Sequence, residues 1–174
     1  MRIGDINMSN RAAKFGSIYF GIFGAIVLIF GIAGFVVIGV HGTEGITWGP
    51  LEMSGMFLVW EAIILVAAGT IYLSSVGNFG DVRQLAKSVA ASIMIWIVAG
   101  MAIWAMIAGS IPGGEEGPWF NPPADFIASY APPYMPAIFL LPFSLAIIYP
   151  IHKRRRAEAR EESKNLGETG TLQL

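Results

Sequence analysis

Glu61 is the residue of this chain whose type and position could do chemistry. It lies in the segment LVWEAII (58–64), about nine positions into an apolar run at residues 53–76. With a rise of about 1.5 Å per residue, that position is near the middle of a bilayer. A carboxylate at this depth costs several kcal/mol if it is charged, so it must be protonated, paired or next to water. Glu61 is therefore a candidate for proton exchange or for a hydrogen bond between helices.

The partner of Glu61 is not a cation of the same chain, because no Lys, Arg or His lies at that depth in any apolar run. Three accounts remain. A neutral Glu61 could donate a hydrogen bond to a helix carbonyl or to a hydroxyl such as Ser144 or Ser92. It could instead exchange protons, or pair with a cation on another chain.

The other residue types that support catalysis are few. His41 follows the first apolar run and His152 follows the fourth, so they are separated by about the hydrocarbon thickness and cannot share a haem. The residues in or beside the outer loops that could in principle bind a divalent cation have no metal-site spacing; they are His41, Glu44, Glu52, Glu115, Glu116 and Asp125. The chain has no Cys and no P-loop, GxSxG or HExxH motif. We predict no catalytic activity for the chain alone, no cofactor and no metal site.

Four apolar runs must position these residues. They cover residues 15–40, 53–76, 82–111 and 134–151, and even the shortest, with 18 residues, is within the range of about 17–25 residues that crosses a bilayer. The composition agrees, since 55% of residues are hydrophobic and only 13% are charged, against about 25% charged in soluble domains. We predict an all-α integral membrane protein with one domain, residues 1–174, of four transmembrane helices.

The positions of the cations predict the orientation. All eleven Lys and Arg residues precede the first run, lie between the second run and the apolar stretch of the third, which starts at Ser88, or follow the fourth run. They are Arg2, Arg11, Lys14, Arg83, Lys87, Lys153, Arg154, Arg155, Arg156, Arg160 and Lys164. Basic residues in short loops stay on the cytoplasmic side. We therefore expect an integral protein of the cytoplasmic or plasma membrane, with both termini inside and two acidic loops outside.

Small residues form a seam along the first run. Alternating steps of four and three place six positions on one helix face, namely Ser17, Gly21, Gly24, Leu28, Gly31 and Phe35. Small residues let another helix approach closely in lipid. A weaker seam in the third run contains Ala91, Val98, Ala102, Ala105 and Gly109. We expect the first and third helices to be neighbours, although the partner of the first seam could also be another subunit.

The second outer loop, residues 111–133, contains six of the ten prolines together with aromatic residues. Asn121 can cap a short helix that begins with proline, and Phe126 and Tyr130 then share a face. We predict a short interfacial helix, and a loop in which Trp119, Phe120, Phe126 and Tyr130 either anchor the chain at the membrane surface or form a docking platform.

A basic segment follows the fourth run, in which Pro142 should bend the helix. Lys153, Arg154, Arg155 and Arg156 form a stop-transfer signal that can also attract anionic lipid headgroups. They are not evidence for nucleic-acid binding. The polar residues 163–174 are predicted to be a disordered cytoplasmic tail.

Two functions of different class fit these observations. The first is a non-catalytic membrane subunit of a larger membrane complex of the energy-converting, respiratory type, with the lipid bilayer and other membrane subunits, or copies of itself, as partners. It is suggested by the glycine seam, the missing catalytic groups and the aromatic loop. The second is a small proton-coupled transporter or channel that uses Glu61.

Overall fold

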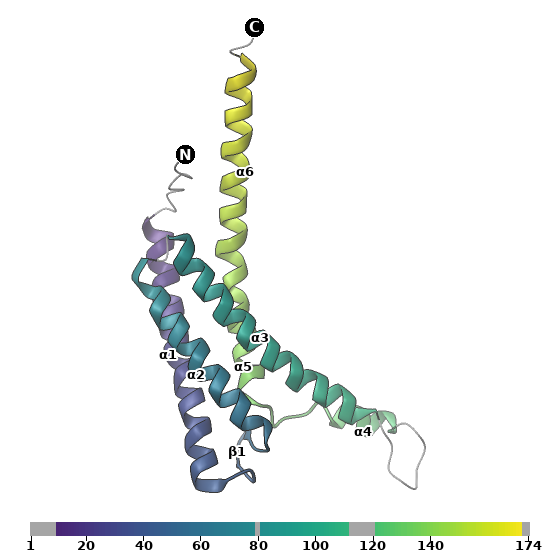
Figure 1. Ribbon diagram of the computed structural model, residues 1–174. Coiled ribbons are helices and arrows are strands. Elements are labelled where there is room, and N and C mark those ends of the chain that lie inside the picture. Colours follow the sequence, from purple (N-terminus) through teal and green to yellow (C-terminus); the bar gives the residue numbers. More distant parts are fainter. Residues whose placement is uncertain (1–9, 79–80, 112–120, 172–174) are drawn as a thin grey trace.

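The computed structural model describes residues 10–78, 81–111 and 121–171. The described residues are mostly helical, and among them four helices are long and apolar enough to cross a membrane: Lys14–His41, Phe57–Ser75, Val82–Ser110 and Pro136–Ala157. This confirms the prediction of a mostly helical chain with four helices of the length and apolarity that a membrane span needs. Both ends of the described chain lie at the same end of the bundle (Figure 1), which we call the terminal end.

The elements follow one another as helices with one small hairpin between the first two spans. Their bounds are α1 Asn10–His41, β1 Ile46–Trp48, β2 Leu51–Met53, α2 Phe57–Ser75, η1 Val76–Asn78, α3 Val82–Ser110, α4 Pro123–Ala128, α5 Pro136–Ser144, η2 Leu145–Ile147 and α6 Ile148–Thr171. The hairpin marks the end of the bundle opposite the termini, which we call the hairpin end (Figure 1).

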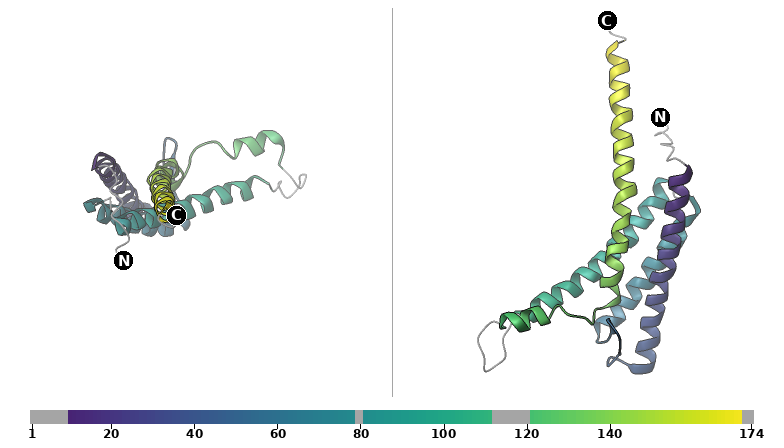
Figure 2. Two further views of the ribbon diagram at one scale, coloured as in Figure 1. Left: turned by 90° about the horizontal axis from the view of Figure 1, so that it is seen from above. Right: turned by 180° about the vertical axis from the view of Figure 1, so that it is seen from behind.

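The spans pack in chain order, with α1 against α2, α2 against α3, and α3 against α5. The expectation that the first and third helices are neighbours is wrong, because α2 lies between them. The core lies where α1, α2 and α3 meet α5 and the start of α6, and includes Phe23, Leu65, Tyr72, Ile95 and Leu140. Towards the hairpin end, α3 diverges from α1 and α2 (Figures 1 and 2).

The glycine seam of α1 packs against α2 of the same chain. A Cβ added at Gly24 would lie 2.6 Å from the Cβ of Tyr72, and one added at Gly31 would lie 2.6 Å from the backbone nitrogen of Val66. At the terminal end, the hydroxyl of Ser17 donates to the carbonyl of Val76. These close backbone contacts are the way in which helices associate where lipid is as apolar as the partner.

Two further glycines take part in this contact and were not identified from the sequence. A Cβ at Gly34 would lie 2.9 Å from the Cβ of Ala62, and a Cβ at Gly69 on α2 would lie 2.6 Å from the backbone nitrogen of Leu28. Gly34 therefore continues the seam where Phe35, which is exposed, was expected. A small residue on α2, Gly69, thus faces the seam of α1. Glycines on both helices therefore allow the two backbones to approach closely.

The hairpin is formed by a tight turn at Gly49 and Pro50. Gly49 has a φ of +59°, which glycine adopts readily and which the first position of a two-residue hairpin turn requires. Ile46 pairs with Met53 and Trp48 with Leu51. The apolar run counted from residue 53 therefore begins in a strand, and α2 begins only at Phe57.

The fourth span is broken rather than bent. Pro142 lacks an N–H and cannot complete the helical ladder, and α5 ends at Ser144 before the single 3₁₀ turn η2. The chain then continues as α6 to Thr171, whereas the sequence predicts disorder from residue 163. Ala, Arg, Lys and Glu after His152 favour helix, and a helix that already exists extends more easily than a new one forms.

The short helix α4 lies in the segment where the sequence predicts one, but Asn121 is not its cap. Pro122 holds the N-cap position and Pro123 follows it as the first helical residue. The side-chain amide of Asn121 instead donates to the carbonyl of Ser110 (2.9 Å). Asn121 therefore satisfies an orphan carbonyl at the end of α3.

A single added methyl group tests the contact between α1 and α2. We expect Gly31→Ala to lower the free energy of unfolding by about 1–3 kcal/mol, because two of the nearest atoms, the nitrogen of Val66 and the carbonyl oxygen of Ala62, are backbone atoms that cannot rotate away. Gly39→Ala in the same helix is the control, since a Cβ there meets nothing within 4 Å, and it should raise stability by up to about 1 kcal/mol. Unfolding of both variants in detergent, followed by circular dichroism, measures this. Equal shifts would refute the contact.

Candidate functional site

Glu61 is buried close to the hairpin end of the bundle. It is the fifth residue of α2, which begins at Phe57, so it lies in the second turn and not near the middle of the span as predicted. The error arises because residues 53–56 belong to the hairpin and the turn after it. The side chain is only 1% exposed.

The carboxyl group of Glu61 contacts the first turn of α5. The backbone N–H of Ala137 donates to its Oε1 atom at 2.8 Å. Pro136 before it has no N–H, and the N–H of Ile138 donates to the carbonyl of Met135 (3.0 Å). Met135, at the N-cap position, makes no side-chain capping bond. Glu61 therefore caps α5 from a neighbouring helix and satisfies a donor that the start of a helix leaves without a partner.

This contact explains how a carboxyl group is accommodated among the apolar helices that the structure describes. The aligned peptide dipoles give the N-terminus of a helix a partial positive charge, which attracts carboxylates. Ala137 thus offers both a donor and a favourable potential. The sequence contains the relevant signal in Pro136, because proline is common in the first turn of a helix and the next N–H then needs an acceptor.

The chain just before α5 is also tied to the hairpin. The N–H of Glu52 donates to the carbonyl of Tyr134 (2.9 Å), and the N–H of Tyr134 donates to the carbonyl of Pro50 (2.7 Å). Leu51 and Tyr134 form a parallel bridge. The start of α5 is therefore held by backbone bonds to the hairpin and by the side chain of Glu61.

The two hydroxyls that the sequence suggested as partners of Glu61 bind other groups. Ser92 shares a hydrogen bond with the hydroxyl of Tyr72 (2.6 Å). Ser144 accepts from the indole nitrogen of Trp96 (2.7 Å) and donates to the carbonyl of Leu141 (2.7 Å). Trp96 was not identified from the sequence, yet it links α3 to α5 as Glu61 links α2 to α5.

A second pair of hydroxyls joins α2 and α3 near the terminal end. Ser75 and Ser88 share a hydrogen bond of 2.7 Å, and both side chains are fully buried. Ser75 also donates to the carbonyl of Tyr72 (2.7 Å). These hydroxyls satisfy one another, as polar groups between membrane helices do, and act as links between helices.

The remaining predicted residues are spread over both ends. His41 and His152 are exposed on different helices, and no group of three or more His, Cys, Asp or Glu that could hold a metal ion occurs in the part of the chain that is described. Lys153, Arg155 and Arg156 are exposed on α6, and Arg154 is half-buried.

Of the four aromatic residues predicted for the outer loop, Phe126 and Tyr130 are in ring contact, with centroids 5.3 Å apart. The hydroxyls of Tyr130 and Ser110 lie 3.2 Å apart, so this loop is attached to the end of α3. Trp119 and Phe120 lie outside the described residues.

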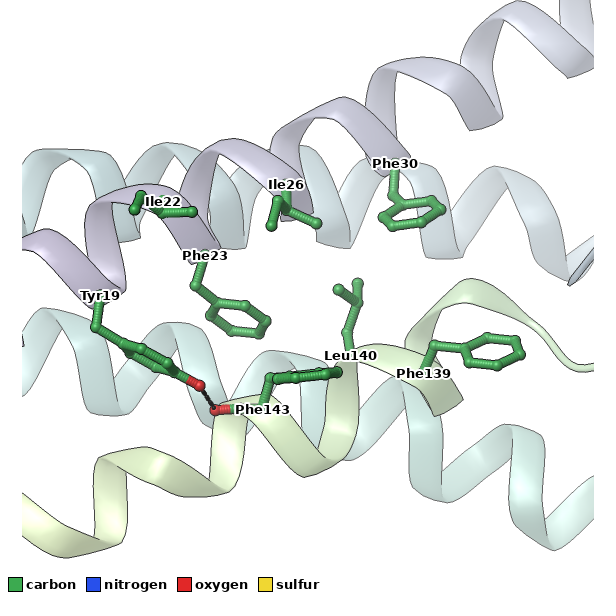
Figure 3. Close-up of a pocket in the computed structure, with 8 residues that line it drawn as sticks. All are labelled: Tyr19, Ile22, Phe23, Ile26, Phe30, Phe139, Leu140 and Phe143. Carbon is green, nitrogen blue, oxygen red and sulfur yellow. Dashed lines mark hydrogen bonds between the residues drawn. The ribbon is translucent and has the colours of Figure 1, made fainter.

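An apolar groove of about 240 Å³ lies between α1 and α5 (Figure 3). From α1 it is lined by Tyr19, Ile22, Phe23, Ile26 and Phe30, and from α5 by Phe139, Leu140 and Phe143. A second apolar crevice of about 490 Å³ lies beside α3, between Phe57, Trp104 and Met135. Glu61 lines neither cavity.

Comparison of the chain with protein-family models, with curated proteins and with solved structures finds no match. The functional argument therefore depends on the contacts described above.

Two substitutions of Glu61 that nearly conserve its volume test its role as a cap. Glu61→Leu leaves the N–H of Ala137 without an acceptor and should lower the free energy of unfolding by about 1–3 kcal/mol. Glu61→Gln keeps an oxygen at that position and should cost less than half as much. Thermal unfolding in the same detergent compares the two variants. If the Leu and Gln variants were equally stable, Glu61 would not cap α5.

Proposed function

We propose that this protein is a non-catalytic membrane subunit of a larger membrane protein complex. The observation that carries this proposal is the use of Glu61 as a cap. Glu61, the acid that the sequence suggested for proton exchange, is 1% exposed and accepts a hydrogen bond from a backbone N–H. It lines neither of the two apolar cavities. A carboxyl group in that setting organises helices, whereas a carrier needs one that water or substrate reaches.

The proposal includes an orientation with both termini in the cytoplasm. The two ends of the described chain lie on the same side of the bundle (Figure 1). The exposed cations Lys14 and Arg83 lie near the starts of α1 and α3, and Lys153 lies near the start of α6, where the fourth span ends. Short basic segments resist translocation. The terminal end is then cytoplasmic, and the hairpin and α4 are outside.

The surface of α4 supports a contact at the outer side. None of the six residues of this helix is buried, although Phe126 is 42% and Ile127 is 71% exposed. Exposed apolar groups on a short helix beyond the spans are covered either by the membrane surface or by a partner. We propose an interfacial helix that also forms part of a docking surface with Tyr130.

We propose that the partners belong to a membrane complex of the energy-converting, respiratory type, and this class of partner should be tested first. Gentle extraction of the protein from its native membrane, followed by native mass measurement, should give a species that contains this chain together with different subunits. A monomer, or an oligomer made only of this chain, would contradict the proposal. The same measurement after stronger detergent gives the mass of the chain alone as a reference.

Proton flux separates the subunit from a proton-coupled carrier. With the full chain reconstituted into liposomes that contain a pH-sensitive dye, we expect the wild type and Glu61→Gln to give the same flux as protein-free liposomes, because Glu61 is a structural cap. A flux in the wild type that disappears in Glu61→Gln would favour the carrier and overturn the subunit proposal.

A further inference from the structure

The groove between α1 and α5 faces outward from the bundle and has an apolar lining of large side chains (Figure 3). At its terminal end the hydroxyl of Tyr19 donates to the carbonyl of Phe143 (2.9 Å). Towards the hairpin end it extends to Phe30 and Phe139. Groups between two membrane spans lie within the hydrocarbon region, so an apolar chain fills this groove in the bilayer.

The lining favours a thin flexible chain over a helix. Membrane helices associate through small residues that let the backbones approach. The small residues of α1, including Gly24 and Gly31, already contact α2. The side that faces α5 carries Phe23, Ile26 and Phe30 instead. A partner helix would be held away by these side chains, whereas an acyl chain can follow the space between them.

Two lysines towards the terminal end of the groove, Lys14 and Lys153, favour a lipid with an anionic headgroup. Neither α1 nor the span Pro136–Ala157 contains an acidic residue, and both have exposed lysines, Lys14 and Lys153. Lys14 lies five residues before Tyr19, and Lys153 lies ten residues after Phe143. On the helical rise these positions are about 7.5 Å and 15 Å beyond the end of the groove. Basic residues between spans bind anionic headgroups.

We propose that this groove binds one anionic phospholipid, with an acyl chain between α1 and α5 and the phosphate near Lys14 and Lys153. The aromatic side chains hold the chain, and the lysines distinguish the headgroup. The lipid would then complete the packing of α1 against the fourth span, which is less extensive than the packing of α1 against α2.

Native mass spectrometry of the purified full-length protein tests the proposal by titration with phosphatidylglycerol and phosphatidylcholine that have the same acyl chains. We expect one phosphatidylglycerol to bind more tightly than phosphatidylcholine. Lys14→Gln and Lys153→Gln should each weaken phosphatidylglycerol binding by roughly fivefold, and leave phosphatidylcholine binding unchanged.

Filling the groove provides the second arm of the test. Ile26→Trp should weaken phosphatidylglycerol binding by roughly tenfold, because the indole occupies the space of the acyl chain. Ile32→Trp is the matched control, since Ile32 is exposed on the same helix and does not line the groove. If Ile26→Trp unfolds below the temperature of the control, Ile22→Trp replaces it, because Ile22 lines the groove and is 61% exposed.

Three results would overturn the proposal. The first is equal affinity of the wild type for the two lipids. The second is a groove-filling variant that binds phosphatidylglycerol as the wild type does. The third is a dimer of the wild type that Ile26→Trp separates, which would assign the groove to a second copy of the chain.

Discussion

The structure depends on one constraint, which is that polar groups between membrane helices must find their partners within the protein. In the described spans, a few polar side chains satisfy this constraint, and each of them joins two helices. Glu61 joins α2 to α5, Trp96 joins α3 to α5 through Ser144, and Ser75 joins α2 to α3 through Ser88. The hydrogen bonds that satisfy these polar groups therefore also connect neighbouring helices. The buried polar side chains serve the assembly of the bundle.

The two faces of α1 have opposite consequences. The face with Gly24, Gly31 and Gly34 lets the backbone approach α2 until an added Cβ would clash. The face with Phe23 and Phe30 meets α5 through large side chains, so the two helices stay further apart. The tight contact between α1 and α2 and the groove between α1 and α5 thus have one cause, the distribution of small and large residues around a single helix.

The sequence predicts the elements better than their contacts. Four spans can be recognised because lipid requires long apolar runs. Pro142 predicts a bend, whereas the structure has a 3₁₀ turn after Ser144. The depth of Glu61 is wrong because a hairpin inside the apolar run is as hydrophobic as a helix, and only the turn at Gly49 could have revealed it. Pro136 indicates that the N–H of Ala137 needs an acceptor, but the sequence does not identify Glu61 as that acceptor. The acceptor of the Ala137 N–H depends on which helices are adjacent. The seams of small residues alone wrongly suggested that α1 and α3 are neighbours.

The position of α5 follows from side chains outside it. With nine residues between Pro136 and Ser144, α5 is shorter than the roughly 12–15 residues that a helix needs to be even marginally stable on its own in water, and Pro142 weakens it further. It is held at its start by Glu61 and at its end by Trp96. Because α6 follows α5 after only the short turn η2, these two contacts also direct the charged helix that leaves the bundle. Glu61 therefore contributes to the position of the fourth span through a hydrogen bond at the start of α5, without any chemical reaction at the carboxyl group itself.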